Sequence, residues 1–355
     1  MLKAAMSLWA KVMRVGPAPG FHSFGALIRN AQGPVVTGSP VALAQALAAL
    51  ERLIELARPQ TAHVTGFTFP HDTSTVLGRH RAVTLADGTT VRLHGMEAGQ
   101  GTPVVFLHTA GADSRQFLHQ LADTELQQHH RLLAFDMPWH GLSSGENNVE
   151  TTACYRLTEA RYLEWVTAYI EKIVKEPVIL VGCSMGASMA LTIAAQRPDL
   201  LRGVVALEAP LCSPGRKSAF LADARIADSQ HNPAYVRAML GPSCPQKQRD
   251  EACAIYAQAR PGVYMGDLGY YSEEYDGKRL APALRTCGVP IELLTGSYDY
   301  SAAPANTRQL LSEIGSSAAT FHEMEGLGHF PMIEDPDRFR PHFRAALARI
   351  KERYP

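Results

Sequence analysis

The stretch VILVGCSMGASMA, residues 178–190, decides the fold of this chain. Its first part is a continuous apolar run that is typical of a buried strand, and its last part is rich in small residues and reads as a helix. Between them GCSMG, residues 182–186, fits the pattern G-x-S-x-G around Ser184. This pattern is typical of a serine held on a sharp strand-to-helix turn, where larger side chains in place of the two glycines would collide with the neighbouring strand and helix.

The same pattern occurs a second time, so the pattern alone does not identify the serine. GLSSG at residues 141–145 also fits, but it continues as a polar loop at 146–148. Only Ser184 has an apolar strand before its turn and a helix of small residues after it, which is the context that the pattern requires. We therefore take Ser184, and not Ser143, as the candidate nucleophile.

A serine nucleophile needs a base that removes its proton and a third group that orients the base. Asp299 lies just beyond the C-terminal end of an expected strand, and His329 lies in the glycine-rich loop GLGHFP at 326–331. The order serine, acid, histidine along the chain is the one expected for a serine on this kind of turn. Glu208, which follows the strand after Ser184, is a rival for the acid.

Acyl transfer also needs hydrogen-bond donors for the oxyanion. We expect the first donor to be the backbone N–H of Met185, because it lies at the positive N-terminus of the helix that follows Ser184. We assign the second to the backbone N–H of Ala110, in the loop at 108–113 that follows an earlier strand.

The rest of the chain alternates between signals for strands and helices. Strands are predicted at 82–85, 91–96, 104–108, 131–135, 178–181, 203–207, 291–294 and 319–322, and helices at 156–174, 187–196, 307–314 and 338–351. Such alternation predicts an α/β fold, with a mostly parallel sheet and helices on both faces. Residues 209–288 interrupt it with helix formers and tyrosines, which predicts an inserted helical cap.

These motifs together resemble the α/β-hydrolase-fold serine hydrolases, from about residue 81 to the C-terminus. The resemblance rests on FLH at 106–108, DMPWHGLS at 136–143, the turn around Ser184, and the loops of Asp299 and His329. It implies a hydrolase core at 61–208 and 289–355, a cap at 209–288, and a helical extension at 1–60. It disfavours haloalkane dehalogenases and epoxide hydrolases, which have an aspartate in place of Ser184.

The chain departs from the family pattern at two positions. Relatives usually have His-Gly where this chain has His108-Thr109, so Thr109 either adds a hydrogen bond beside the oxyanion site or narrows the acyl pocket. Trp139 replaces the glycine of the usual D-x-P-G-H-G segment, and its indole either lines the pocket mouth or packs in the interior. His140 stands at a family position that is usually structural, so we assign it no catalytic role.

Composition narrows the classes of partner. Lys plus Arg and Asp plus Glu are equal at 34 each, so there is no basic excess for nucleic acid, and no apolar run approaches the length of a membrane span. The six cysteines form no CxxC pair, and we expect no metal or other cofactor. We expect the cysteines to be free thiols and the protein to be cytoplasmic. The amphipathic helix that starts at Ser39-Pro40 is expected to cover the core or to form a homodimer.

The function predicted from these residues is the two-step hydrolysis of a small, moderately apolar carboxylic ester. Three other hydrolytic reactions remain open: cleavage of a carbon–carbon bond in aromatic ring-fission products, and hydrolysis of an amide or a lactone. Against the carbon–carbon reaction, the His-Gly-Gly stretch of that group is absent. A ligand-binding protein that keeps the fold without turnover is the alternative from another class.

Overall fold

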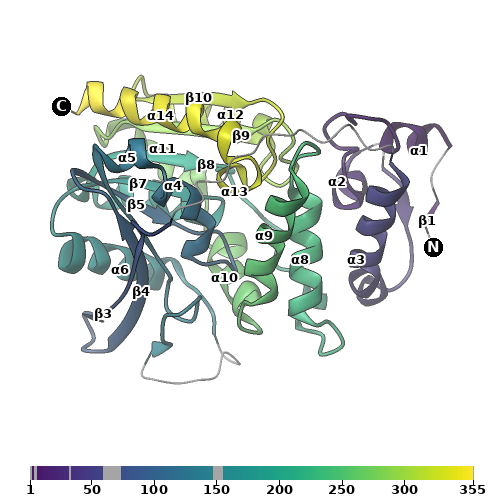
Figure 1. The fold of residues 1–355 in the computed structure, drawn as a ribbon, viewed down its shortest axis with the longest axis horizontal. Coiled ribbons are helices and arrows are strands. Elements are labelled where there is room, and N and C mark those ends of the chain that lie inside the picture. Colours follow the sequence, from purple (N-terminus) through teal and green to yellow (C-terminus); the bar gives the residue numbers. More distant parts are fainter. Residues whose placement is uncertain (1, 4–5, 32, 59–72, 147–154, 355) are drawn as a thin grey trace.

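The computed structural model describes residues 2–3, 6–31, 33–58, 73–146 and 155–354, and a mostly parallel sheet lies at its centre (Figure 1). In spatial order its strands are β10 (Ala319–Met324), β9 (Ile291–Gly296), β8 (Leu201–Leu207), β7 (Val178–Cys183), β5 (Thr102–Leu107), β6 (His130–Phe135), β4 (Thr90–Ala98) and β3 (Leu77–Thr84). Neighbours from β10 to β6 run parallel, and β4 and β3 are antiparallel to their neighbours. The predicted α/β fold is confirmed.

The central strands are buried on both faces, and their side chains alternate between two apolar clusters. On β5, Val105 and Leu107 belong to one cluster, whereas Val104 and Phe106 belong to the other. All four side chains are almost completely buried. Each contributes about 1.5–3 kcal/mol relative to an exposed position, which is why these strands read as continuous apolar runs.

Helices cover both faces of the sheet. One face carries α6 (Glu159–Tyr169), its π-helical continuation Ile170–Val174, α7 (Met185–Gln196), α11 (Gly277–Thr286) and α12 (Pro304–Ile314). The other carries the turn Ser114–Phe117, α4 (Leu118–Leu121), α5 (Thr124–Gln127), α13 (Pro331–Glu334) and α14 (Pro336–Arg353). Further short helical turns are Pro198–Leu200 and Ala219–Ala222.

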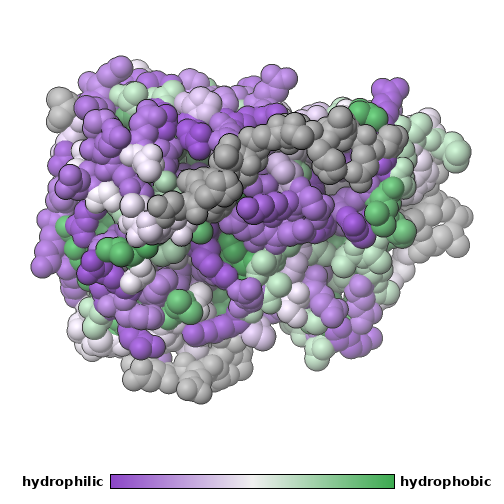
Figure 2. Space-filling model, in the orientation of Figure 1, coloured by the Kyte–Doolittle hydropathy of each residue, from purple (hydrophilic) through white to green (hydrophobic). Residues whose placement is uncertain are grey.

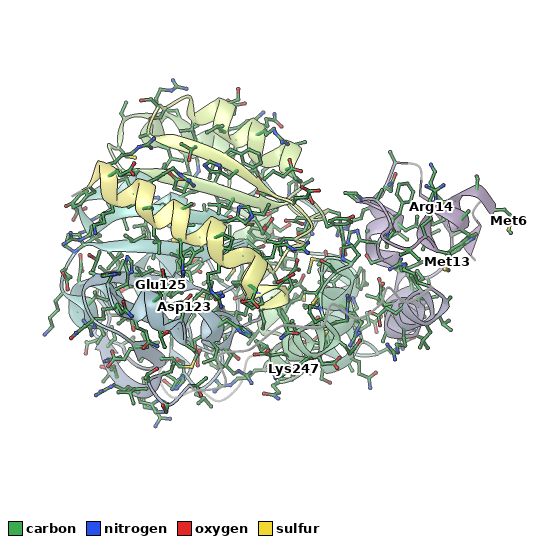
Figure 3. All side chains as sticks on the ribbon, turned by 45° about the horizontal axis from the view of Figure 1, so that its top comes forward. Met6, Met13, Arg14, Asp123, Glu125 and Lys247 are labelled. Carbon is green, nitrogen blue, oxygen red and sulfur yellow. The ribbon has the colours of Figure 1, made fainter. Side chains whose placement is uncertain are left out.

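Ion pairs join the last helix, α14, to α5 on the same face of the sheet. Asp123, labelled beside α14 in Figure 3, accepts hydrogen bonds from Arg340 Nε at 3.1 Å and from Arg344 Nη2 at 3.0 Å. Glu125 forms an ion pair with Arg344 Nη1 at 2.5 Å. The stacked rings of Phe339 and Phe343 on the same helix are buried against the sheet. The last helix, α14, is therefore held by both charge and packing.

The segment between β8 and β9 supplies α8 (Asp228–Met239), α9 (Gln246–Ala257), α10 (Val263–Glu273) and α11. The first three lie beyond the sheet edge in Figure 1, whereas α11 packs against α7 and α12 of the core. We therefore propose that the cap consists of α8–α10 and that α11 belongs to the core layer. The other expected boundary, at 60/61, lies outside the described residues.

The N-terminal extension packs on the cap, at the end of the molecule that carries Met6, Met13 and Arg14 in Figure 3. It contains β1 (Leu2–Lys3) paired with β2 (Val35–Val36), α1 (Met6–Val12), α2 (Phe24–Arg29) and α3 (Pro40–Ala57). The predicted helix with its Ser39 N-cap is confirmed as α3. Leu47 and Ile54 of α3 share an apolar cluster with Ala234 of α8, so α3 covers the cap, and a homodimer stays a prediction.

The surface in Figure 2 alternates between hydrophilic and hydrophobic residues on the face shown. None of the helices in the described parts of the chain is long and apolar enough to cross a membrane.

The two glycines of the Ser184 turn can be tested by adding one methyl group. A Cβ at Gly186 would lie 2.3 Å from the Leu107 carbonyl oxygen, whereas one at Gly78 would meet only the His94 side chain, at 3.2 Å. We expect Gly186→Ala to lower the free energy of unfolding by about 3 kcal/mol or more, because backbone atoms cannot move aside. Gly78→Ala, the control, should change it by less than about 1 kcal/mol in chemical denaturation; equal effects would contradict the steric argument.

Candidate active site

Ser184 stands on a strained turn at the carboxyl end of β7. Its backbone has φ +55° and ψ −113°, a region that L residues rarely adopt. Two hydrogen bonds hold it there: its N–H donates to the Leu207 carbonyl at 2.8 Å, and its carbonyl accepts from the Ser188 N–H at 3.0 Å. The backbones of Gly182 and Gly186 lie so close together that a Cβ atom on Gly182 would overlap the Gly186 backbone. The turn therefore presents the Ser184 side chain at the edge of the sheet.

Asp299 and His329 come together at the same edge. The His329 Nδ1 atom donates to Asp299 Oδ2 at 2.7 Å, and both side chains are buried. Asp299 Oδ1 accepts from the backbone N–H groups of Ser301 at 2.6 Å and Ala302 at 3.0 Å. Burial alone would raise the pKa of Asp299, but His329 and these bonds outweigh it and lower the pKa to about 2. Asp299 is thus an ionised acceptor for the imidazole.

Glu208 lies behind this pair, and the structure gives it a different set of partners. Its two carboxyl oxygens accept from the Gly296 N–H at 2.9 and 3.1 Å, and it hydrogen-bonds the Asp299 side chain. Burial, and then the charge of Asp299, raise its pKa well above the ordinary value. This environment favours the protonated form of Glu208, which can donate a hydrogen bond to Asp299.

Glu208, Asp299 and His329 also place their ligand atoms within 4.8 Å of one another, as a metal site would. The atoms that would bind a metal are already engaged, however. His329 Nδ1 is bonded to Asp299, and burial favours a proton on Glu208. We assign no metal to this cluster.

The Ser184 hydroxyl is bonded to the cap in this structure. Its Oγ donates to the Tyr271 hydroxyl of α10 at 3.1 Å. Within the described residues no hydrogen bond joins Ser184 to His329, although both line the same pocket. Burial raises the pKa of Tyr271 to about 12, so its hydroxyl is neutral. The Ser184 hydroxyl is thus directed toward the cap and not toward His329 in this structure.

The two N–H groups expected at the oxyanion site lie in this region of the structure. Met185 is the first residue of α7, where backbone N–H groups have no partner inside the helix. In the described parts of the chain, neither its N–H nor that of Ala110 is bonded to a protein acceptor. The neighbouring N–H groups are occupied: that of Thr109 donates to Gln116 Oε1 at 3.0 Å, and that of Gly111 to Asp267 Oδ2 at 2.7 Å.

Thr109 faces the cap across the pocket. Its hydroxyl donates to Gln116 Oε1 at 3.1 Å and forms a short hydrogen bond with the Tyr256 hydroxyl of α9. The hydroxyl thus joins the loop after β5 to the cap, and Thr109 lines the pocket together with Ala110.

Trp139 lies elsewhere. It has a positive φ of 74°, its ring centroid is 6.1 Å from that of Tyr155, and it is not among the described residues that line the pocket. Of the two roles expected for the indole, we propose packing.

A buried network joins the cap to the oxyanion loop. Asp267 of α10 accepts from the Gly111 N–H at 2.7 Å, from the Tyr155 hydroxyl at 2.7 Å and from His140 Nε2 at 2.8 Å. His140 Nδ1 faces the Pro138 carbonyl at 2.9 Å, so both ring nitrogens meet acceptors. Burial lowers the pKa of His140, but Asp267 outweighs it and raises the pKa above its ordinary value.

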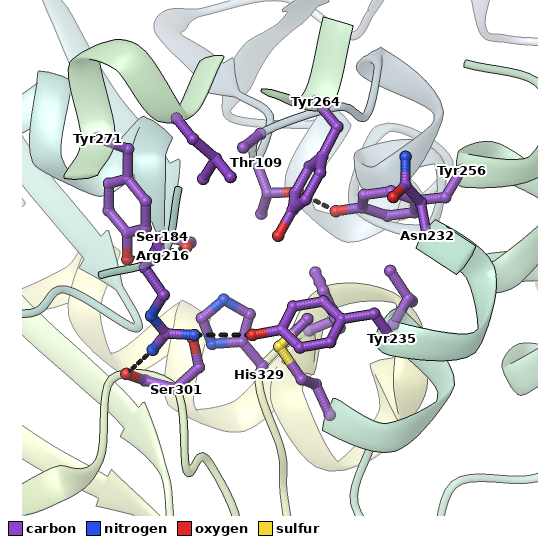
Figure 4. A pocket seen from close by; sticks show the side chains of 15 residues that line it. Thr109, Ser184, Arg216, Asn232, Tyr235, Tyr256, Tyr264, Tyr271, Ser301 and His329 are labelled. Atoms are coloured by element: carbon purple, nitrogen blue, oxygen red, sulfur yellow. Dashed lines mark hydrogen bonds between the residues drawn. The ribbon is translucent and has the colours of Figure 1, made fainter. Parts of the chain in front are cut away.

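The pocket between core and cap holds about 420 Å³ of empty space, including its opening (Figure 4). Ser184, His329, Thr109 and Ala110 line its core side. The cap side is lined by hydroxyl, amide and apolar side chains: Asn232, Tyr235, Val236, Met239, Tyr256, Tyr264, Leu268 and Tyr271. Arg216, on the segment that leads from β8 into the cap, also lines it. Sequence reasoning pointed to the cap tyrosines but missed Arg216, because a lone arginine in a loop looks like an ordinary surface residue.

Comparisons with known proteins agree with this arrangement. The model of the alpha/beta hydrolase family matches residues 104–341. The chain therefore belongs to the alpha/beta hydrolase family, and the resemblance noted in the sequence is confirmed.

Individual relatives are distant. A hydrolase of (E)-2-((N-methylformamido)methylene)succinate from Acinetobacter baylyi is 28% identical over 32% of this chain, and the match spans only 40% of that protein. A malate-bound esterase from Thermogutta terrifontis has a TM-score of 0.65 at 19% identity, covering 77% of this chain and 99% of its own. An enol-lactonase from Burkholderia xenovorans LB400 has a TM-score of 0.64 at 19% identity, covering 76% and 100%. These structural likenesses show the fold.

Replacing Asp267 by asparagine tests the network. Because the pKa of His140 is raised in the folded state, the pair stabilises the fold fully below about pH 6.5, and this stabilisation fades as pH rises through the folded-state pKa. We expect Asp267→Asn to lower the free energy of unfolding by about 3–5 kcal/mol at pH 6 and by less at pH 9.

Denaturant titrations at the two pH values measure this difference. Asp250→Asn is the control, because Asp250 pairs with Arg237 at the surface, and its loss should be worth less than about 1 kcal/mol. A loss for Asp267→Asn that does not change with pH would contradict a charged His140–Asp267 pair.

Proposed function

We propose that this protein is a serine hydrolase that cleaves a small carboxylic ester through an acyl-enzyme. Ser184 is the nucleophile, His329 the base and Asp299 the group that orients it. The N–H groups of Ala110 and Met185 bind the oxyanion. The observation that carries the proposal is the 2.7 Å bond between His329 Nδ1 and an ionised Asp299, in a pocket that Ser184 also lines.

The proposed reaction starts when the Ser184 hydroxyl rotates from Tyr271 toward His329. Nε2 is the nitrogen of His329 that can take the proton, because Nδ1 is bonded to Asp299. As Oγ attacks the ester carbonyl, negative charge develops on the carbonyl oxygen and meets the two N–H groups at the N-terminus of α7 and in the loop after β5. His329 then protonates the departing alcohol, and a water activated by His329 releases the acid.

Hydrolysis of a lactone or an amide is the second candidate. One structural relative is an enol-lactonase and one sequence relative is a hydrolase of a formamido-substituted succinate, so the same fold serves bonds other than simple esters. The triad chemistry is the same for these substrates, and the leaving group decides among them. Parallel rates on a phenyl ester, a lactone, an anilide and a vinylogous diketone of similar size test the proposal; cleavage of the diketone alone would overturn it.

Covalent labelling tests the nucleophile directly. A fluorophosphonate probe should label one serine, and mass spectrometry should place the adduct on Ser184. Ser184→Ala should abolish the label and lower kcat by up to about a millionfold. Ser143→Ala is the matched control, since Ser143 lies in the second G-x-S-x-G match, and it should keep the label. Turnover by Ser184→Ala within about tenfold of the unchanged protein would refute the assignment.

Two carboxyl substitutions separate the acids. Asp299→Asn should lower kcat by about 10⁴-fold, because an amide can hold the imidazole in the wrong tautomer. Glu208→Gln should keep kcat within about tenfold, because a protonated Glu208 and a glutamine both donate a hydrogen bond to Asp299. Steady-state rates of both variants decide the question, and the reverse order of effects would assign the acid to Glu208.

A further inference from the structure

Arg216 is a charged residue in the pocket that the proposed reaction does not use. It lies on the segment between β8 and α8, and its backbone N–H donates to Ser272 Oγ of α10 at 3.0 Å. Its side chain lines the same pocket as Ser184 and His329. The position is therefore fixed by the cap, within the space where a substrate of Ser184 has to lie.

The guanidinium is held in one orientation by two acceptors, a hydroxyl and a backbone carbonyl. Nη1 donates to the Tyr235 hydroxyl at 2.9 Å, and Nη2 donates to the backbone carbonyl of Ser301 in the Asp299 loop. Figure 4 shows the group stretched between these two residues and beside the His329 ring. Because both Nη atoms of the guanidinium are already hydrogen-bonded, the side chain loses little further conformational entropy when a ligand binds.

The charge of Arg216 has no acidic partner. Throughout the described ranges no carboxylate lies within salt-bridge distance of its guanidinium, although the adjacent Lys217 pairs with Glu273 at 3.1 Å. The nearby acid Asp299 is engaged by His329. The other groups close to Arg216 are the hydroxyls of Tyr235, Tyr264 and Tyr271. A partly buried cation without a counter-charge destabilises the free protein, and an anion in the pocket would relieve this.

We propose that Arg216 binds a carboxylate of the substrate, so that the substrate is an ester, lactone or amide that also carries a free carboxyl group. This inference rests on the proposed function for the reacting bond, but the anion site itself does not depend on turnover. A guanidinium and a carboxylate form two parallel charge-assisted hydrogen bonds, which fix orientation as well as adding affinity. The substrate class is thus a small acid whose carboxylate lies across the pocket from the scissile bond.

A carboxylate fits the pocket better than a phosphate. Among the described residues that line the pocket, the basic ones are Arg216 and His329. The remaining polar side chains there carry hydroxyl groups or, in one case, an amide. One guanidinium matches a single negative charge, whereas a phosphate dianion would leave charge uncompensated.

Equilibrium binding to the inactive Ser184→Ala protein tests the anion site without any reaction. Isothermal titration should detect binding of the monoanions monomethyl succinate or monomethyl glutarate and should detect little binding of the neutral dimethyl glutarate. Adding Arg216→Gln should weaken acid binding by about 10- to 100-fold, the size expected for a charge-assisted hydrogen bond. Arg225→Gln is the control, since Arg225 is an exposed arginine paired with Asp223, and it should leave binding unchanged.

Three results of this titration would overturn the proposal. They are no binding of either acid, equal binding with and without Arg216, and tighter binding of inorganic phosphate than of both acids. Circular dichroism checks that Arg216→Gln is folded. If it is not, Arg216→Lys serves instead, because it keeps the charge and loses the planar fork; its acid binding should be weaker than that of the Ser184→Ala protein with Arg216 intact, and equal binding would overturn the proposal.

Kinetics then connect the site to the reaction. Monophenyl succinate carries the carboxylate, and phenyl 4-oxopentanoate has a methyl ketone of similar shape in its place. Arg216→Gln should lower kcat/KM about 10- to 100-fold for the first and less than about threefold for the second. Equal losses on both would make Arg216 a structural link between cap and core and would overturn the proposal. If neither ester is cleaved by the unchanged protein, the proposed function fails, and the titration still decides the carboxylate site.

Discussion

The contact between the glycine backbones of β7 and α7 is the constraint on which the site depends. Gly182 and Gly186 approach each other, and Gly186 approaches the Leu107 carbonyl, more closely than any side chain would allow. This contact brings the N-terminus of α7 to the end of the strand and forces Ser184 into a conformation with φ +55°. The strain is sustained because the sheet and helix on either side of the turn are buried. One steric requirement thus sets both the exposure of the hydroxyl and the direction of the helix N–H groups.

The pattern of apolar residues along the sequence was sufficient to predict the sheet. Its strands are apolar on both faces, and in the helices around it apolar residues recur with the helical period. The same holds for the neighbourhood of Asp299 and His329, since each lies at the end of a predicted strand, and parallel strands end at one edge. Element ends moved by a few residues: β7 extends to Cys183 and α7 begins at Met185. Those shifts lie at the turn itself, where hydrogen bonds between distant residues define the ends.

The cap could not be derived in the same way. Its contacts with the core join residues far apart in sequence, such as Asp267 with Gly111 and Tyr256 with Thr109. Nothing in a single sequence signals which tyrosine will meet a threonine some 150 positions away. The choice between Asp299 and Glu208 was also open in the sequence, because both follow strands. In the structure both are buried, but His329 is bonded to Asp299, whereas Glu208 accepts from the Gly296 N–H.

The cap is anchored at several points around its rim. The Met239 carbonyl accepts the His329 N–H at 3.0 Å, the buried Glu334 accepts from Gly241 at 3.2 Å, and α3 packs on the outer side of α8. Arg237 of α8 is further paired with Glu55 at 3.0 Å. A domain fastened in this way cannot swing open as a unit without breaking the bonds that position the histidine loop.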